Sequence, residues 1–262
     1  MHRLPFAVLT IAAAFLAALL FAENSSSSSL AADVSPTPVV VELFTSEGCS
    51  SCPPADQLLQ NFDKQPFPGA QLIVLSEHVD YWNHNGWSDP FSSSIYSQRQ
   101  STYGNRLRLE SVYTPEMIVD GSDEFVGTDS KEAAKVIGRV SSTRKIPLRI
   151  SDLNVDGNFL KAHLETGTLP AKADVYLVLA LNHAESQVAG GENSGRRLTH
   201  VAVARAFVKT GSANAGESYA RDVSLKIDTK ADPSQLRIIA FIQESGQGRI
   251  LGASLAQLVR QP

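Results

Sequence analysis

The first half of the chain alternates short apolar runs with segments in which apolar residues recur at helical spacing. Short runs of β-branched and aliphatic residues bounded by turn residues are typical of buried strands, whereas recurrence at every third or fourth position indicates an amphipathic helix. The pattern predicts strands at 39–45 and 72–80 and helices at 53–62, 92–109 and 129–142. Strands that alternate with helices predict an α/β domain.

The pattern changes near Ile146 and Pro147, beyond which short runs alternate between apolar and polar residues. Asp156 and Gly157 lie between two such runs, which is a strong signal for a β-hairpin. The predicted strands of this half are 148–153, 159–165, 174–182, 199–208, 222–227, 236–243 and 250–258. Short strands at this spacing predict an all-β, sandwich-like domain. The predicted α/β domain therefore takes residues 36–145, and the β domain takes residues 146–262.

The N-terminus has the pattern of an export signal. Arg3 precedes an apolar run from Phe6 to Ala22, and a serine-rich stretch follows. We therefore expect residues 1–35 to be a signal peptide and a flexible leader of an extracytoplasmic protein, periplasmic or secreted. An uncleaved anchor is the alternative, and only in that case is membrane attachment expected.

Composition supports a folded protein and narrows the class of partner. Of the 262 residues, 43% are hydrophobic and 19% are charged, and this low charge density argues against disorder. The formal net charge is −4, and no long run of lysine or arginine occurs. Because nucleic acid is bound through clustered positive charge, it is excluded as a partner.

The most informative motif is Cys49-Ser50-Ser51-Cys52, which contains both cysteines of the chain. A disulfide between such near neighbours closes a very short loop and adds little stability, so a chemical role is favoured. The motif lies between a predicted strand and a predicted helix, which is the arrangement of thioredoxins. N–H groups at a helix N-terminus stabilise a thiolate. We therefore expect Cys49 to be the more accessible, attacking thiol and Cys52 to be the resolving thiol.

Four further residues complete the predicted catalytic set. The Thr114–Pro115 peptide begins an apolar stretch that ends at a glycine, and in thioredoxin-like proteins such a peptide is cis and lies beside the CxxC motif. An ordinary trans turn proline is the alternative. His78 ends the second strand and is either a proton donor or acceptor for the thiols or a structural histidine. Glu42, on the first strand, is either a proton shuttle or a semi-buried structural acid.

Two loops are expected to supply substrate contacts. Trp82 and Trp87, the two tryptophans of the chain, either form a substrate-facing rim or pack the next helix onto the sheet. Arg196 and Arg197 end a glycine-rich stretch and either reach the thiols or belong to a solvated hairpin loop. The expected partners are protein or small-molecule thiols and disulfides, and no cofactor is expected.

Thiol–disulfide exchange is the predicted function, and two alternatives stay open. A buried, inert CxxC disulfide would make the protein a non-enzymatic secreted binding protein, and exposure of the Cys49 sulfur distinguishes these possibilities. Cys49, Cys52 and His78 together would instead suit copper(I), as in a copper-binding accessory protein. A zinc site lacks its second half, since no other cysteine pair occurs. The predicted site residues therefore include no metal ligand.

Several motifs in order resemble a known family. They are VELFTSEGCSSCPPAD at 41–56, HVDYW at 78–82, GWSDPF at 86–91, VYTPEM at 112–117 and GGENSGRRLTH at 190–200. Together they resemble the secreted family named domain of unknown function 1223, over nearly the whole mature chain. The resemblance implies a thioredoxin-like fold with an appended β domain, and it implies no particular activity.

Overall fold

The computed structural model describes residues 35–227 and 232–258, and residues Pro36–Pro262 form one compact unit. The expected export signal in residues 1–34 lies outside the described residues. The helices are α1 (Pro53–Lys64), α2 (Ser94–Leu107) and α3 (Ser130–Val140), with a short 3-10 helix at Pro233–Gln235. The strands are β1 (Thr37–Thr45), β2 (Ala70–His78), β3 (Glu116–Val119), β4 (Asp123–Val126), β5 (Leu148–Asp156), β6 (Phe159–Thr166), β7 (Ala173–Gln187), β8 (Arg197–Ala213), β9 (Ala220–Lys226), β10 (Leu236–Glu244) and β11 (Ile250–Gln257).

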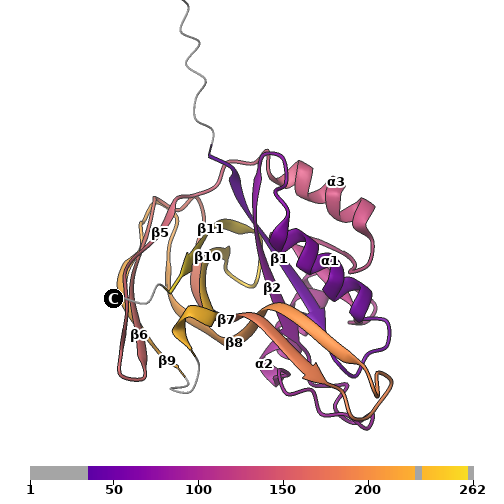
Figure 1. Ribbon diagram of the computed structural model, residues 1–262. Coiled ribbons are helices and arrows are strands. Elements are labelled where there is room, and N and C mark those ends of the chain that lie inside the picture. Colours follow the sequence, from indigo (N-terminus) through magenta and orange to yellow (C-terminus); the bar gives the residue numbers. More distant parts are fainter. Residues whose placement is uncertain (1–34, 228–231, 259–262) are drawn as a thin grey trace, which may run out of the picture. The chain divides into compact units, whose positions relative to one another are not determined.

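Strands from both halves of the chain form one large mixed sheet (Figure 1). Its order is β11-β10-β7-β8-β2-β1-β3-β4, and a second sheet has the order β5-β6-β9. The long strand β8 joins the halves, because it pairs antiparallel with β7 and parallel with β2 where Ser76 meets Val203. Without β8, the buried strand β2 would be an edge strand with unpaired backbone groups.

The predicted fold class is therefore wrong. A thioredoxin-like α/β domain followed by a separate sandwich-like β domain would need two independent sheets, one in each half of the chain. The protein is instead mostly β, with three helices in its described part and one eight-stranded sheet that runs through both halves. The strand pattern of the second half was nevertheless informative, because the hairpin predicted at Asp156 and Gly157 is confirmed by the pairing of β5 with β6.

Strand β1 is covered on both faces, and this determines where its side chains lie. Val41 and Leu43 pack with residues of α1 and α3, while Val40 and Phe44 face apolar clusters that include the α2 residues Tyr96 and Tyr103. Successive side chains of a strand point to opposite faces. Glu42 therefore lies on the face opposite to α1.

The three predicted helices are confirmed, and Asp129 caps the N-terminus of α3. The Asp129 side chain accepts hydrogen bonds from the backbone N–H groups of Lys131 and Glu132, which satisfies donors that a helix N-terminus otherwise leaves free. The short strand β4 was not predicted. Among the described residues, no helix is long and apolar enough to cross a membrane.

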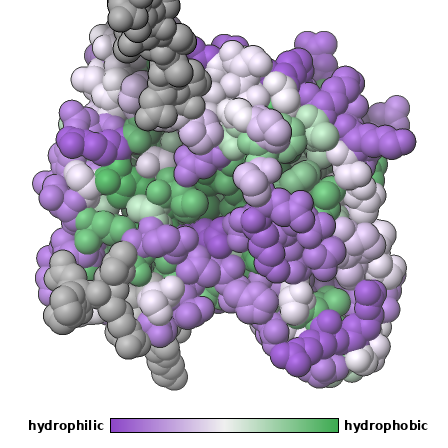
Figure 2. Space-filling view, turned by 45° about the horizontal axis from the view of Figure 1, so that its top comes forward, coloured by the Kyte–Doolittle hydropathy of each residue, from purple (hydrophilic) through white to green (hydrophobic). Residues whose placement is uncertain are grey.

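The start of β1 borders an apolar hollow. Figure 2 shows hydrophobic residues gathered in the middle of one face, with hydrophilic residues around them. A hollow of about 370 Å³ is lined mainly by apolar residues of β1, β11 and the segment before β5, among them Pro38, Ile146, Pro147 and Leu255. None of its lining residues belongs to the CxxC segment, so it is distinct from the site described next.

Candidate functional site

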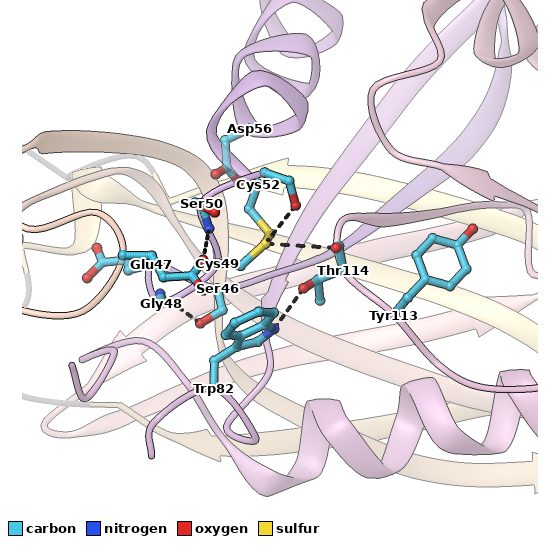
Figure 3. Close-up of a disulfide and its surroundings, with 12 residues drawn as sticks. Ser46, Glu47, Gly48, Cys49, Ser50, Cys52, Asp56, Trp82, Tyr113 and Thr114 are labelled. Carbon is cyan, nitrogen blue, oxygen red and sulfur yellow. Dashed lines mark hydrogen bonds between the residues drawn. A yellow bond between two sulfur atoms is a disulfide. The ribbon is translucent and has the colours of Figure 1, made fainter. Parts of the chain in front are cut away.

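The two cysteines form a disulfide between the end of β1 and the start of α1 (Figure 3). Their Cα atoms are 5.5 Å apart, which is the usual separation for a disulfide. Cys52 is the N-cap residue of α1, with right-handed helical backbone angles, and the N–H groups of Ala55 and Asp56 donate to its carbonyl. The helix N-terminus that can stabilise a thiolate is thus directly at the disulfide.

The Thr114–Pro115 segment lies against Cys49. The predicted cis peptide is confirmed, and the Thr114 carbonyl oxygen is 3.8 Å from the Cys49 sulfur. The Trp82 indole N–H donates to the Thr114 hydroxyl at 2.8 Å, so Trp82 contacts the segment that lies against Cys49 (Figure 3). Trp82 also packs against the cluster that contains Tyr103 of α2. The packing role considered for this tryptophan is therefore confirmed, and the same side chain also contacts the Thr114 segment beside Cys49.

Both cysteines are fully buried. Cys49 and Cys52 are each 0% exposed, whereas Ser50 and Ser51 between them are exposed. In the disulfide form the two cysteines are equally buried, and the expectation that Cys49 is the more accessible thiol concerns the reduced protein and stays a prediction. Burial of both cysteines is the outcome expected of an inert disulfide.

The loop between β7 and β8 covers the CxxC segment from the second half of the chain. The Asn193 side chain is buried and donates to the carbonyl oxygens of Glu47 and Cys49, each at 2.9 Å. The Glu192 carboxylate accepts from the Ser50 N–H at 3.0 Å. A Cβ atom on Gly190 would lie 2.3 Å from the Gly86 carbonyl oxygen, so only glycine allows the loop to pass this close to the backbone at Gly86.

The two arginines of this loop have different positions. Arg196 donates to the Asn193 side-chain oxygen at 2.7 Å, which orients the amide NH₂ toward the cysteine segment. Arg197 is exposed and pairs with Glu185 of β7. Arg196 therefore acts on the site through Asn193. The sequence interpretation considered the arginines and missed Glu192 and Asn193, although both lie in the same glycine-rich motif.

His78 and Glu42 lie away from the sulfurs. The His78 ring nitrogen Nδ1 is 2.7 Å from the Asp89 carboxylate, and no hydrogen bond joins His78 to either cysteine. The Glu42 carboxylate is buried on the opposite face of β1, where it accepts from Arg99 and Tyr103, both at 2.7 Å. Among the described residues, no group of three or more His, Cys, Asp or Glu side chains could hold a metal ion.

A second group of polar residues is buried next to the CxxC segment and was not predicted. Glu47 is fully buried and accepts from the Trp87 indole N–H at 2.8 Å and from Ser186. His200 of β8 lies between two carboxylates, with Nε2 3.3 Å from Glu47 and Nδ1 3.6 Å from Asp56. Both Glu47 and Asp56 flank the cysteines in sequence, so β8 brings a buried histidine to the site.

The charge of His200 follows from its neighbours. Burial by itself would lower the pKa of His200, but the carboxylates of Asp56 and Glu47 outweigh it and raise the pKa to about 10. The His78 ring packs edge-on against His200 with centroids 4.6 Å apart. Burial would raise the pKa of Asp89, which holds His78, but contacts with His78 and with the N–H groups of Glu47 and Phe91 lower it below its usual value.

This charge predicts a dependence of stability on pH. Because the pKa of His200 is raised from about 6.5 to about 10 on folding, its contribution is fully present below pH 6.5 and is lost as pH rises through 10. We expect the difference in free energy of unfolding between wild type and His200→Gln to shrink from pH 6.5 to pH 10 in urea titrations. A difference that stays constant over this range would contradict the assigned charge.

Comparison with known proteins adds a family and a fold. The family described as "Protein of unknown function (DUF1223)" has a model that matches residues 40–243. A crystal structure of a protein from Agrobacterium tumefaciens is 26% identical, with a TM-score of 0.68, and the match covers 87% of this chain and 97% of that one. HBP35 of Porphyromonas gingivalis is similar in fold, with 15% identity, a TM-score of 0.63 and coverage of 87% and 80%. No curated protein matches the chain.

Proposed function

This chain belongs to the DUF1223 family, a family of unknown function, and we propose from its own site that Cys49 and Cys52 form a redox couple that exchanges with thiols and disulfides. The observation that carries the proposal is the position of the disulfide at the N-terminus of α1. Helix N–H groups stabilise the thiolate that exchange requires. Because the loop that it closes is short, the disulfide adds little stability to the fold, and a structural role alone does not explain it.

The contacts around the disulfide suit exchange with a partner sulfur. In the reduced form, the Thr114 carbonyl would accept from a Cys49 thiol, and Ser51, whose hydroxyl lies 3.3 Å from the Cys49 sulfur, would donate to a thiolate. Since the sulfurs are fully buried in the disulfide form, the covering residues must move before a partner attacks. We propose that the loop carrying Glu192 and Asn193 is the part that moves, because side-chain hydrogen bonds to the backbone attach it to the cysteine segment.

The proposed place of action is outside the cytoplasm. The basic and apolar N-terminal pattern of residues 1–22 supports export. An oxidising compartment would keep the two cysteines paired until a reducing partner arrives. The proposed partners are protein or small-molecule thiols and disulfides.

A structural disulfide is the second candidate, and the 0% exposure of both cysteines favours it. A redox titration separates the two functions. The folded protein is equilibrated with mixtures of reduced and oxidised dithiothreitol, and free thiols are alkylated and counted by mass spectrometry. We expect a reduction potential above about −300 mV and reduction without denaturant, because structural disulfides fall below that value. Reduction that occurs only when urea unfolds the protein would establish the structural role.

A further inference from the structure

Reaction at these cysteines must move protons in a place that solvent does not reach. Opening the disulfide releases a thiolate at the resolving cysteine, and closing it requires that cysteine to lose a proton. Cys52 is 0% exposed and is the N-cap residue of α1. A buried thiol needs a protein group that takes and returns its proton.

Asp56 is placed to be that group. It lies four residues after Cys52 on α1, which puts the two side chains on the same face of the helix, and Figure 3 shows Asp56 beside Cys52. The Asp56 oxygen Oδ1 is buried and makes no hydrogen bond, and its ion-pair partner His200 Nδ1 lies 3.6 Å away. A carboxylate kept for structure alone would have its buried oxygens satisfied by hydrogen bonds.

The groups around Asp56 form a buried cluster of titratable side chains. His200 faces Asp56 from β8, and Glu47 faces His200 from the turn after β1. His78 and Asp89 are the other titratable side chains of this cluster. The Asp56 side chain is 6% exposed, whereas those of Glu47, His78 and Asp89 are 0% exposed and that of His200 is 1% exposed. Asp56 is therefore the member through which a proton can pass between this cluster and water.

We propose that Asp56 is the acid–base group for Cys52 and that His200, oriented by Glu47, is the residue that positions it. The inference rests on the proposed redox function.

The Cys49 thiolate attacks a partner disulfide, forming a mixed disulfide and expelling one partner thiolate. Asp56 then takes the proton of Cys52. The Cys52 thiolate attacks the Cys49 sulfur, the bond to the second partner sulfur breaks with its electron pair, and that sulfur leaves as a thiolate. The partner is reduced by two electrons, the couple is oxidised by two, and the proton passes from Asp56 to solvent.

The test measures the resolving step separately from the attack. Reduced full-length protein is mixed with oxidised glutathione, and the glutathionyl adduct on Cys49 and its conversion to the Cys49–Cys52 disulfide are followed by acid quench and mass spectrometry from pH 6 to 9. In Asp56→Asn we expect the adduct to form at the wild-type rate and to resolve at least about tenfold more slowly. Asp56→Glu, which keeps a carboxylate, should recover part of the rate. The control is Asp63→Asn, which makes the same change two turns further along α1 and should resolve like wild type.

The outcomes distinguish this inference from the function on which it rests. A folded wild-type protein that forms no adduct and no disulfide defeats the redox function itself. A wild type that reacts while Asp56→Asn resolves equally fast, with an unchanged pH profile, overturns the role of Asp56 alone. If Asp56→Asn does not fold, His200→Gln takes its place: a shifted pH profile of resolution supports the inference, and an unchanged profile overturns it.

Discussion

Replacing Arg99 by methionine should lower the free energy of unfolding by about 3–5 kcal/mol, because it leaves buried carboxylates without their counter-ion. Arg99 of α2 is 5% exposed and donates to Glu42 of β1 at 2.7 Å, and its Nε lies 3.6 Å from Glu77 of β2. Burial, together with the nearby Glu42 charge, raises the pKa of Glu77 well above its usual value even with Arg99 present. The measurement is a urea unfolding titration at pH 8.

Two comparisons test the reason given for this loss. Arg149→Met removes an exposed pair with Glu165 and should cost less than about 1 kcal/mol. In Arg99→Met the buried carboxyl groups should bind protons on folding, so the variant should lose more stability at pH 8 than at pH 5. Equal losses at the two pH values, or a loss no larger than that of Arg149→Met, would show that the guanidinium does not neutralise buried charge.

Replacing Asn193 by leucine should destabilise the protein by about 2–4 kcal/mol, because two buried carbonyl groups lose their donors. Asn193 is 0% exposed and donates to the carbonyls of Glu47 and Cys49. The same change should weaken the attachment of the covering loop, so reduction of the disulfide by dithiothreitol in the folded state should become faster. Urea titration and the rate of thiol release measure the two effects.

The control for this prediction is Asn214→Leu. Asn214 is exposed, and its side chain and N–H group donate to Glu217 in the same turn. Its replacement should change the free energy of unfolding by less than about 0.5 kcal/mol and should leave the rate of disulfide reduction unchanged. If Asn193→Leu is as stable as wild type, the amide does not hold the loop. If Asn193→Leu is less stable but its disulfide is reduced at the wild-type rate, movement of the loop between β7 and β8 is not what exposes the disulfide.

Features set by neighbouring residues could be predicted from the sequence. The CxxC motif, between a predicted strand and a predicted helix, placed the two cysteines at a helix N-terminus, and this position is confirmed. The cis Thr114–Pro115 peptide, the three helices and the hairpin at Gly157 are likewise confirmed. Each depends on backbone preferences and side-chain periodicity within a few residues, which a sequence displays directly.

The fold class could not be predicted in the same way. Apolar periodicity shows that β2 and β8 are buried strands, and it does not show that they are neighbours. Their pairing joins Ser76 to Val203, and it turns two predicted domains into one sheet. Every strand presents the same backbone N–H and C=O groups, so these groups do not select which strands pair. The packing of the whole protein determines the pairing.

The site shows the same division between local and tertiary information. By itself, the sequence determined the disulfide, the helix that begins at it and the proline segment beside it, since these follow from local chemistry. Only the tertiary structure decided that Glu47, in the turn after β1, is buried, and that Asn193 and His200 reach it from the other half of the chain. Polar residues in turns are ordinarily solvated, and their burial here depends on a long hairpin that covers them, which no local pattern encodes.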